Sequence, residues 1–185
     1  YPFSLVKFFL DNLALGVFPS WNPFYVCGVS EEMLLTYAGI TNPVWLLTLV
    51  LSKLGLDFYR AFLVTIVLYY FLGIFGFYAL AKPLLKNAQA AYLAYLLLLF
   101  SSFSLISLTQ YHPVLFYVPS VWFLYFLVSF CESGKKCHLV GLTVSLMIIM
   151  TVYLPFYFAT LMLFIVAAGL VVYPKELWSA LSRAG

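Results

Sequence analysis

The stretch Ala61–Ala81, AFLVTIVLYYFLGIFGFYALA, has no charged side chain over its whole length and is followed closely by Lys82 and Lys86. A helix needs about 20 mostly apolar residues to cross the hydrocarbon core of a bilayer. The run therefore predicts a membrane-spanning helix. Cytoplasmic loops of membrane proteins carry an excess of Lys and Arg, so the lysines place the end of this helix in the cytoplasm. The residues before Ala61 are then expected on the outer side.

Further apolar runs follow, and the positive charges lie in alternate gaps between them. Lys135 and Lys136 share one gap, whereas the gap Gln110–Pro113 has no Lys or Arg. The last run, Leu139–Tyr173, would be about 52 Å long as one helix, so we predict two helices that turn at Pro155. The predicted spans are 61–81, 88–109, 114–130, 139–154 and 156–173.

This pattern predicts an all-α polytopic membrane protein with about five transmembrane helices, in which residues 61–185 form the bundle. The whole chain is interpreted as a single structural domain with a cytoplasmic C-terminus. Composition agrees, because 65% of the residues are hydrophobic and only 8% are charged, unlike soluble domains. The net charge of +3 follows from the orientation of the loops, and no nucleic-acid partner is expected.

Residues 1–60 are predicted to form an extracytoplasmic loop region with short interfacial helices. Phe3–Leu15 has a polar stripe on an otherwise apolar helix, and Gly16 follows in the usual position for a helix stop. Asn42–Pro43 is typical of a helix start, and Gly55 ends that second helix. Both helices are too short to span, so we expect them to lie in the plane of the interface.

The segment between these two helices carries a family resemblance. It reads GVFPSWNPFYVCG from Gly16 to Gly28, and it resembles the first outer loop of YfhO-like bacterial membrane proteins, whose pattern is roughly G-x-x-P-x-W-N-P-x-x-x-x-G. Glycine and proline set turns in such loops, so the signature is interpreted as structural. The matching residues are Gly16, Pro19, Trp21, Asn22, Pro23 and Gly28.

The resemblance implies a membrane-embedded glycosyltransferase of the GT-C class. Such an enzyme transfers a sugar from a polyprenyl-phosphate donor to a cell-surface polymer or lipid on the extracytoplasmic side. The class carries an acidic catalytic residue early in its first outer loop, and here that residue is expected upstream of Tyr1. The chain is therefore expected to be a piece that lacks the first transmembrane helix, and no catalytic residue is assigned. A divalent metal ion is left open as a cofactor.

Three cationic groups are candidates for contact with the donor phosphate, namely Arg60, Lys53 and His112. The predicted spans have no Asp, Glu, Lys, Arg or His, and positive charge stabilises a leaving phosphate. Structural interpretations stay open beside this one, because Arg60 with Asp57 can simply flank the start of a span. The partners implied are membrane lipids, the lipid-linked sugar and the glycopolymer acceptor.

Two other functions stay open from the sequence. One is a flippase or transporter for a lipid-linked saccharide, and the other is a non-catalytic scaffold subunit of a membrane complex. Ion-coupled transporters usually carry ionisable groups near the membrane midplane, which makes the absence of such groups unfavourable to transport. Cys131, Cys137 and His138 form a C-x5-C-H pattern that matches no common zinc spacing, so no metal site is predicted.

Overall fold

The computed structural model of the 185-residue chain describes residues 2–22, 29–30, 39–109, 111–152, 155–172 and 182. Most of these residues are helical, and two short strands lie near the N-terminus. In chain order the elements are α1 (Pro2–Ala14), β1 (Trp21–Asn22), β2 (Val29–Ser30), α3 (Trp45–Lys53), α4 (Phe58–Leu85), α5 (Ala88–Leu99), α6 (Ser102–Thr109), α7 (Tyr111–Ser133), α8 (Lys136–Ile149) and α9 (Pro155–Val172).

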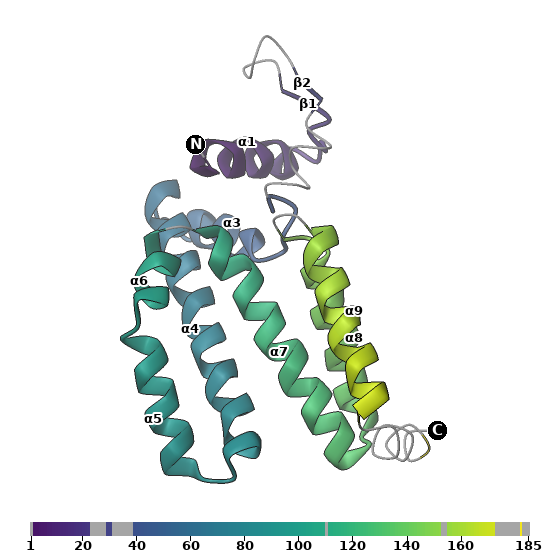
Figure 1. Cartoon of the computed structure of the whole chain (residues 1–185). Coiled ribbons are helices and arrows are strands. Elements are labelled where there is room, and N and C mark those ends of the chain that lie inside the picture. Colours follow the sequence, from purple (N-terminus) through teal and green to yellow (C-terminus); the bar gives the residue numbers. More distant parts are fainter. Residues whose placement is uncertain are drawn as a thin grey trace.

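The long helices form an upright bundle, and two short helices lie across one of its ends (Figure 1). α7 packs against both α4 and α8, and α5 packs along α4. α1 and α3 lie across the end at which α4 and α7 begin, which we call the α1–α3 end. At the opposite end α4 and α7 finish and α5 and α8 begin. The two short helices predicted in the N-terminal region are thus present, and they lie across one end of the bundle.

Glycines bring α4 and α7 into close contact. A Cβ placed on Gly73 would lie 2.7 Å from the Tyr117 ring, and one on Gly76 would lie 2.9 Å from the Trp122 indole. The same aromatic side chains donate to the α4 backbone, with Tyr117 Oη 3.2 Å from the Gly73 carbonyl oxygen. Trp122 Nε1 donates to the Leu72 carbonyl at 3.2 Å. Small residues at helix interfaces allow such close approach.

The helix expected over 88–109 is instead two helices, α5 and α6, and this part of the prediction is wrong. The break lies at Phe100 and Ser101. Ser101 Oγ donates to the Leu98 carbonyl at 2.7 Å and accepts from the Ser104 backbone N–H at 3.4 Å. Serine side chains compete in this way with the backbone ladder of a helix. Ser104 Oγ also accepts from the buried Tyr70 hydroxyl at 2.5 Å, which ties the break to α4.

Two helix ends and one helix start lie close to the positions that the sequence predicts. Gly16 follows α1 with φ +74° and Gly55 follows α3 with φ +102°, the left-handed conformation that glycine adopts without strain. Asn42 Oδ1 accepts from the Val44 N–H at 3.0 Å, which places a turn directly before α3. The short helices of the N-terminal region therefore begin and end close to the positions predicted from their flanking glycine and asparagine residues.

The remaining boundaries differ from the predicted spans because charge-free runs do not mark the ends of helices. α4 includes Lys82, since a long side chain can extend its charge to the interface while its backbone stays helical. His112 and Pro113, expected in the gap between two spans, lie in the first turn of α7. Proline is tolerated there because the first N–H groups of a helix have no intrahelical partner. α8 ends at Ile149 and α9 begins at Pro155. The predicted division of the last run into two helices is therefore confirmed, but the first helix ends five residues before the predicted residue 154.

Two of the described helices, α4 and α7, are long and apolar enough to cross a membrane by length and composition. α5, α8 and Thr160–Gly169 within α9 are shorter apolar helices. Lysines lie at the end of the bundle opposite α1 and α3, whereas Arg60 of α4 lies at the α1–α3 end. Lys82 lies in the last turn of α4 and Lys86 caps it, and Lys135 caps the start of α8.

Candidate functional site

Aromatic side chains join four helices at the α1–α3 end. Phe62 of α4 stacks on Trp45 of α3 with ring centroids 5.3 Å apart, and Phe3 of α1 meets the edge of the Phe62 ring at 5.5 Å. Tyr111 of α7 lies 5.8 Å from Trp45. The Trp45 indole is buried and donates to the Gly39 carbonyl at 2.9 Å. These contacts form a packed base beneath the polar residues of this end.

A second contact fixes α3 across the bundle. Thr48 Oγ1 donates to Thr65 Oγ1 at 2.9 Å, and Thr65 Oγ1 donates to the Ala61 carbonyl at 2.9 Å. Both threonines are fully buried. Buried hydroxyl groups that lose their partner cost roughly 1–3 kcal/mol, so this chain of hydrogen bonds favours one position of α3 on α4.

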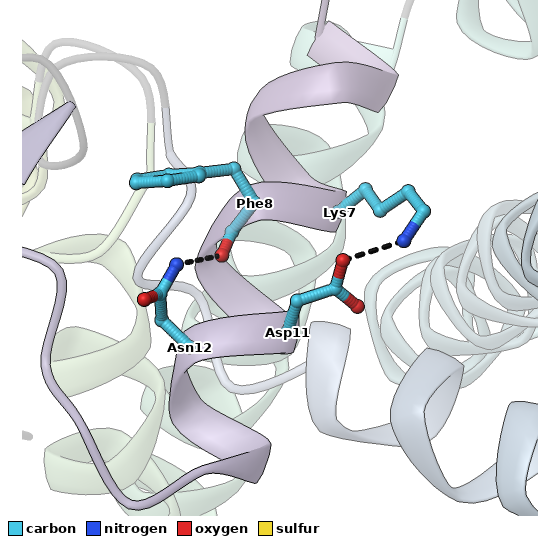
Figure 2. A network of polar contacts seen from close by, with 4 residues as sticks. All are labelled: Lys7, Phe8, Asp11 and Asn12. Carbon is cyan, nitrogen blue, oxygen red and sulfur yellow. Dashed lines mark hydrogen bonds and ion pairs between the residues drawn. The ribbon is translucent and has the colours of Figure 1, made fainter. Parts of the chain in front are cut away.

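The two ion pairs among the described residues both lie at this end. Lys7 and Asp11 pair along α1, and Figure 2 shows them on one side of the helix with Phe8 and Asn12 toward the other. The Lys7 ammonium also lies 5.3 Å from the centre of the Phe58 ring. Asp57 Oδ2 lies 3.0 Å from Arg60 Nε. The side chains of the first pair are about half exposed, and in the second pair Arg60 is more exposed than Asp57.

The three predicted phosphate-binding residues belong to three helices at this end. Arg60 lies in the first turn of α4 with 80% of its side chain exposed. His112 lies in the first turn of α7, half-buried, with its ring 3.8 Å from that of Tyr111. Lys53 is exposed at the last residue of α3, eight residues or about 12 Å beyond Trp45. The Trp45–Tyr111 contact thus brings the start of α7 to the start of α3, while Lys53 lies at the other end of α3.

The described part of the loop signature surrounds the end of α1 and the strand β1. Gly16 terminates α1, and Pro19 is buried. Trp21 and Asn22 form β1, which pairs antiparallel with β2 so that Trp21 lies opposite Ser30. The sequence predicted only a turn-rich loop here and missed this pairing. Pro23 and Gly28 lie outside the described residues, as does Gln110.

A cavity of about 430 Å³ lies between the start of α3, the middle of α4 and the end of α8. Its polar lining consists of Asn42 and Tyr69, and leucines of α3 and α4 supply much of the remainder. The sequence identified Asn42 only as a helix cap. The cavity has no signal in the sequence, because it depends on how α3, α4 and α8 pack.

Within the described residues, no group of three or more His, Cys, Asp or Glu side chains lies close enough to hold a metal ion. Comparison of the chain with protein-family models, with curated proteins and with solved structures gave no match. The chemistry of the α1–α3 end and the arrangement of the helices are therefore the basis for a functional proposal.

Proposed function

We propose that the chain is a multi-pass part of a membrane-embedded glycosyltransferase of GT-C type, with the α1–α3 end on the extracytoplasmic side. The observation that carries this proposal is the gathering of the ion pairs and the three candidate cations at the end crossed by α1 and α3. Beneath this polar surface the bundle presents apolar flanks. A charged headgroup held above apolar helices is the environment that a lipid-linked substrate needs.

Exposed apolar side chains support the membrane location. Large hydrophobic residues are exposed along α4, among them Leu68, Phe71 and Phe75, and others lie along α5, α8 and α9. Soluble monomers rarely expose apolar patches larger than a few hundred Å². In a bilayer these side chains contact lipid tails, and α5 with α6, α8 and α9 complete the five predicted crossings.

The distribution of lysines supports the orientation. Lys82, Lys86, Lys135 and Lys136 lie at the end opposite α1 and α3. The positive-inside rule then favours a cytoplasmic location for that end and an extracytoplasmic location for the α1–α3 end.

In this proposal the donor is a polyprenyl-phosphate sugar whose phosphate contacts the α1–α3 end. Arg60 uses Nε toward Asp57, and its terminal guanidinium nitrogens suit an anionic oxygen. Lys53 and His112 supply further donors on neighbouring helices. The acceptor hydroxyl loses its proton to a general base. The bond from the sugar to the phosphate breaks as the new glycosidic bond forms, and cationic side chains stabilise the leaving phosphate.

A transfer assay tests the enzymatic part. The full-length protein is incubated with polyprenyl-phosphate sugars and a surface-glycopolymer acceptor, and the released polyprenyl phosphate is measured. Arg60→Ala is expected to lower kcat/KM at least tenfold, with smaller losses for Lys53→Ala and His112→Ala. The matched controls are Lys82→Ala and Lys86→Ala at the opposite end, which should leave transfer unchanged. Equal effects at both ends, or no turnover with any donor, contradict the proposal.

Cysteine labelling tests the orientation separately. Cys137 lies exposed at the start of α8, and Leu15→Cys would place a thiol just after α1, where the side chain is exposed. With the other cysteines replaced by serine, a membrane-impermeant maleimide should label Leu15→Cys in intact cells and Cys137 only after lysis. The reverse pattern contradicts the orientation.

A further inference from the structure

Four aromatic side chains line an open pocket between α4 and α5, toward the end opposite α1 and α3. Phe75 and Tyr78 line it from α4, and Tyr92 and Tyr95 line it from α5. Its volume of about 370 Å³ is within the range of roughly 300–1,000 Å³ that is usual for ligand pockets. Phe75 is 63% exposed and Tyr92 is 56% exposed, so a ligand can reach this aromatic pocket from the flank of the bundle.

Contacts between the rings hold the walls of the aromatic pocket. The ring of Tyr95 lies nearly parallel to that of Tyr92, with centroids 5.9 Å apart. It also lies nearly perpendicular to the ring of Tyr78 on the other helix, with centroids 6.2 Å apart. Aromatic rings attract each other in both arrangements. The pocket is therefore part of the packing of α5 on α4.

Two lysines lie directly beyond the aromatic pocket. Lys82 follows Tyr78 by four residues on α4, a spacing that makes two side chains neighbours on one helix face, and Lys86 caps the same helix. Both lysines are exposed, and neither forms an ion pair with a described residue. Residues 58–109 have no Asp or Glu. The positive charge beside the pocket is thus available to an anion.

We propose that the aromatic pocket and the two lysines bind one anionic phospholipid. Its phosphate contacts Lys82 and Lys86, and its glycerol esters and upper acyl chain contact the aromatic rings. This proposal rests on the membrane location proposed above, in which Phe75 and Tyr78 belong to the charge-free stretch 61–81 and the lysines lie at its edge. A ligand that contacts both needs an apolar part in the bilayer and a negative charge at its surface, where lysines attract anionic lipids.

Other occupants fit these residues less well. Aromatic rings attract the quaternary ammonium of a choline lipid, but that group would add a positive charge beside two lysines. A polyprenyl phosphate has the charge but no ester carbonyls to accept from tyrosine hydroxyl groups, which tyrosine presents at the polar end of an apolar ring. A soluble anion would leave the aromatic rings without a partner.

Native mass spectrometry of the detergent-purified chain tests the occupant. The probes are dioleoyl phosphatidylglycerol and dioleoyl phosphatidylcholine, which differ only in the headgroup. One phosphatidylglycerol should bind per chain, with an affinity about tenfold above that of phosphatidylcholine. Equal affinity for the two lipids would overturn the charge contact. Equal or tighter binding of a polyprenyl phosphate, or displacement of the lipid by inorganic phosphate, would overturn the phospholipid as the occupant.

Lysine variants test the location of the headgroup. The double variant Lys82→Gln with Lys86→Gln should abolish the preference for phosphatidylglycerol. The matched control is Lys135→Gln with Lys136→Gln, which removes the same charge from exposed positions at the start of α8 and should keep the preference. Equal losses for the two double variants would mean a diffuse attraction and would overturn the site.

An aromatic variant tests the location of the chains. Tyr92→Ala should weaken binding of both lipids about fivefold and leave their ratio unchanged, because the ring contacts the part that the two lipids share. The control is Leu93→Ala, the next residue on α5, which is 58% exposed and does not line the pocket. It should bind both lipids as the unmodified chain does, and equal weakening by the two variants would overturn the contact.

These measurements need no sugar donor or acceptor. Loss of the phosphatidylglycerol preference would therefore contradict the lipid site and leave the proposed transfer reaction standing. Absence of transfer would leave the lipid result unchanged. A chain that stays soluble and monomeric without detergent would contradict the membrane location on which both proposals rest.

Discussion

The two faces of α4 have similarly apolar side chains but different surroundings. Toward α7 the helix presents Gly73 and Gly76, and aromatic side chains of α7 fill the space that a Cβ would need. On the other face Phe71 and Phe75 are exposed, and Leu68 lines the open cavity. The face toward α7 is packed against other helices and hydrogen-bonded to them, whereas the side chains of the other face are exposed.

This difference shows which residues distinguish the packed face from the exposed face of a helix that is hydrophobic all round. Lipid tails are as apolar as leucine, so apolar side chains alone give helices in a membrane little reason to associate. On α4 the packed face is marked by small residues and hydroxyl groups, among them Gly73, Tyr70 and Thr65. The tests that follow exploit this contrast.

The largest effect is expected from Gly73→Leu on the packed face. A Cβ at this position already lies 2.7 Å from Tyr117 and 2.8 Å from Val118, so the added side chain must displace α7. Overpacking of this kind typically costs 1–3 kcal/mol, occasionally more, and we expect a loss of about 3 kcal/mol in the free energy of unfolding. Denaturation by SDS in mixed micelles measures it.

The control is Val67→Leu on the exposed face of the same helix, since Val67 is 40% exposed. It should change the free energy of unfolding by less than about 0.5 kcal/mol. Similar losses for the two variants would remove the distinction between the faces.

A medium effect is expected where Tyr70 meets the serine break. Ser104→Ala leaves the buried Tyr70 hydroxyl without its acceptor and should cost about 2 kcal/mol. Tyr70→Phe should cost about 1 kcal/mol, because Ser104 Oγ keeps its hydrogen bond to the Leu98 carbonyl. In a double-mutant cycle the combined variant should lose less than the sum of the two. Simple additivity would mean that the two hydroxyl groups are not coupled.

A smaller effect is expected at the start of α4. Asp57 Oδ1 accepts from the Arg60 N–H at 3.1 Å, and loss of such a cap costs about 1 kcal/mol. Asp57→Ala should show this loss in thermal unfolding. Asp57→Asn retains a capping oxygen and removes only the exposed ion pair, so its loss should stay below about 0.5 kcal/mol. A larger loss for the asparagine variant would mean that the ion pair, and not the capping hydrogen bond, stabilises the start of α4.

The smallest effect is expected for the pair Lys7 and Asp11 on α1. Both side chains are about half exposed, and with the lysine N-terminal to the acid the order is the weaker one on a helix. Lys7→Met should lower the free energy of unfolding by about 0.3 kcal/mol at low salt, and the difference should vanish in 1 M salt. A loss that persists at high salt would indicate that the packing of Lys7 on Phe58 matters more than its charge.

Glycine and proline residues that end or begin helices made much of the fold predictable. Gly16, Gly55 and Pro155 act locally, and the structure has helix ends or starts beside each of them. The break at Ser101 was missed because it lies within an apolar run and depends on side-chain hydrogen bonds and on Tyr70 of a distant helix. The start of α7 was misplaced because Pro113 suits a turn and the first turn of a helix equally well.

The candidate site was predictable only as a set of residues. The charge pattern placed Arg60, Lys53 and His112 on one side, and they do lie at one end of the bundle. Their spacing depends on the stack of Trp45 on Phe62 and on its contact with Tyr111, which joins segments far apart in the sequence. Local sequence cannot encode these distances.

The charge-free part of α4 has a consequence for the height of the polar surface. The helix has 28 residues, or about 42 Å, but its charge-free stretch 61–81 is only about 31 Å long, close to the roughly 30 Å hydrocarbon core of a typical bilayer. In the proposed orientation this stretch fills the hydrocarbon without excess, and the turns that carry Arg60 and Lys82 extend beyond it at either end. α3 is fastened to α4 by Thr48 and Thr65, so α4 would hold α3 and the candidate site at a fixed height beside the lipid headgroups.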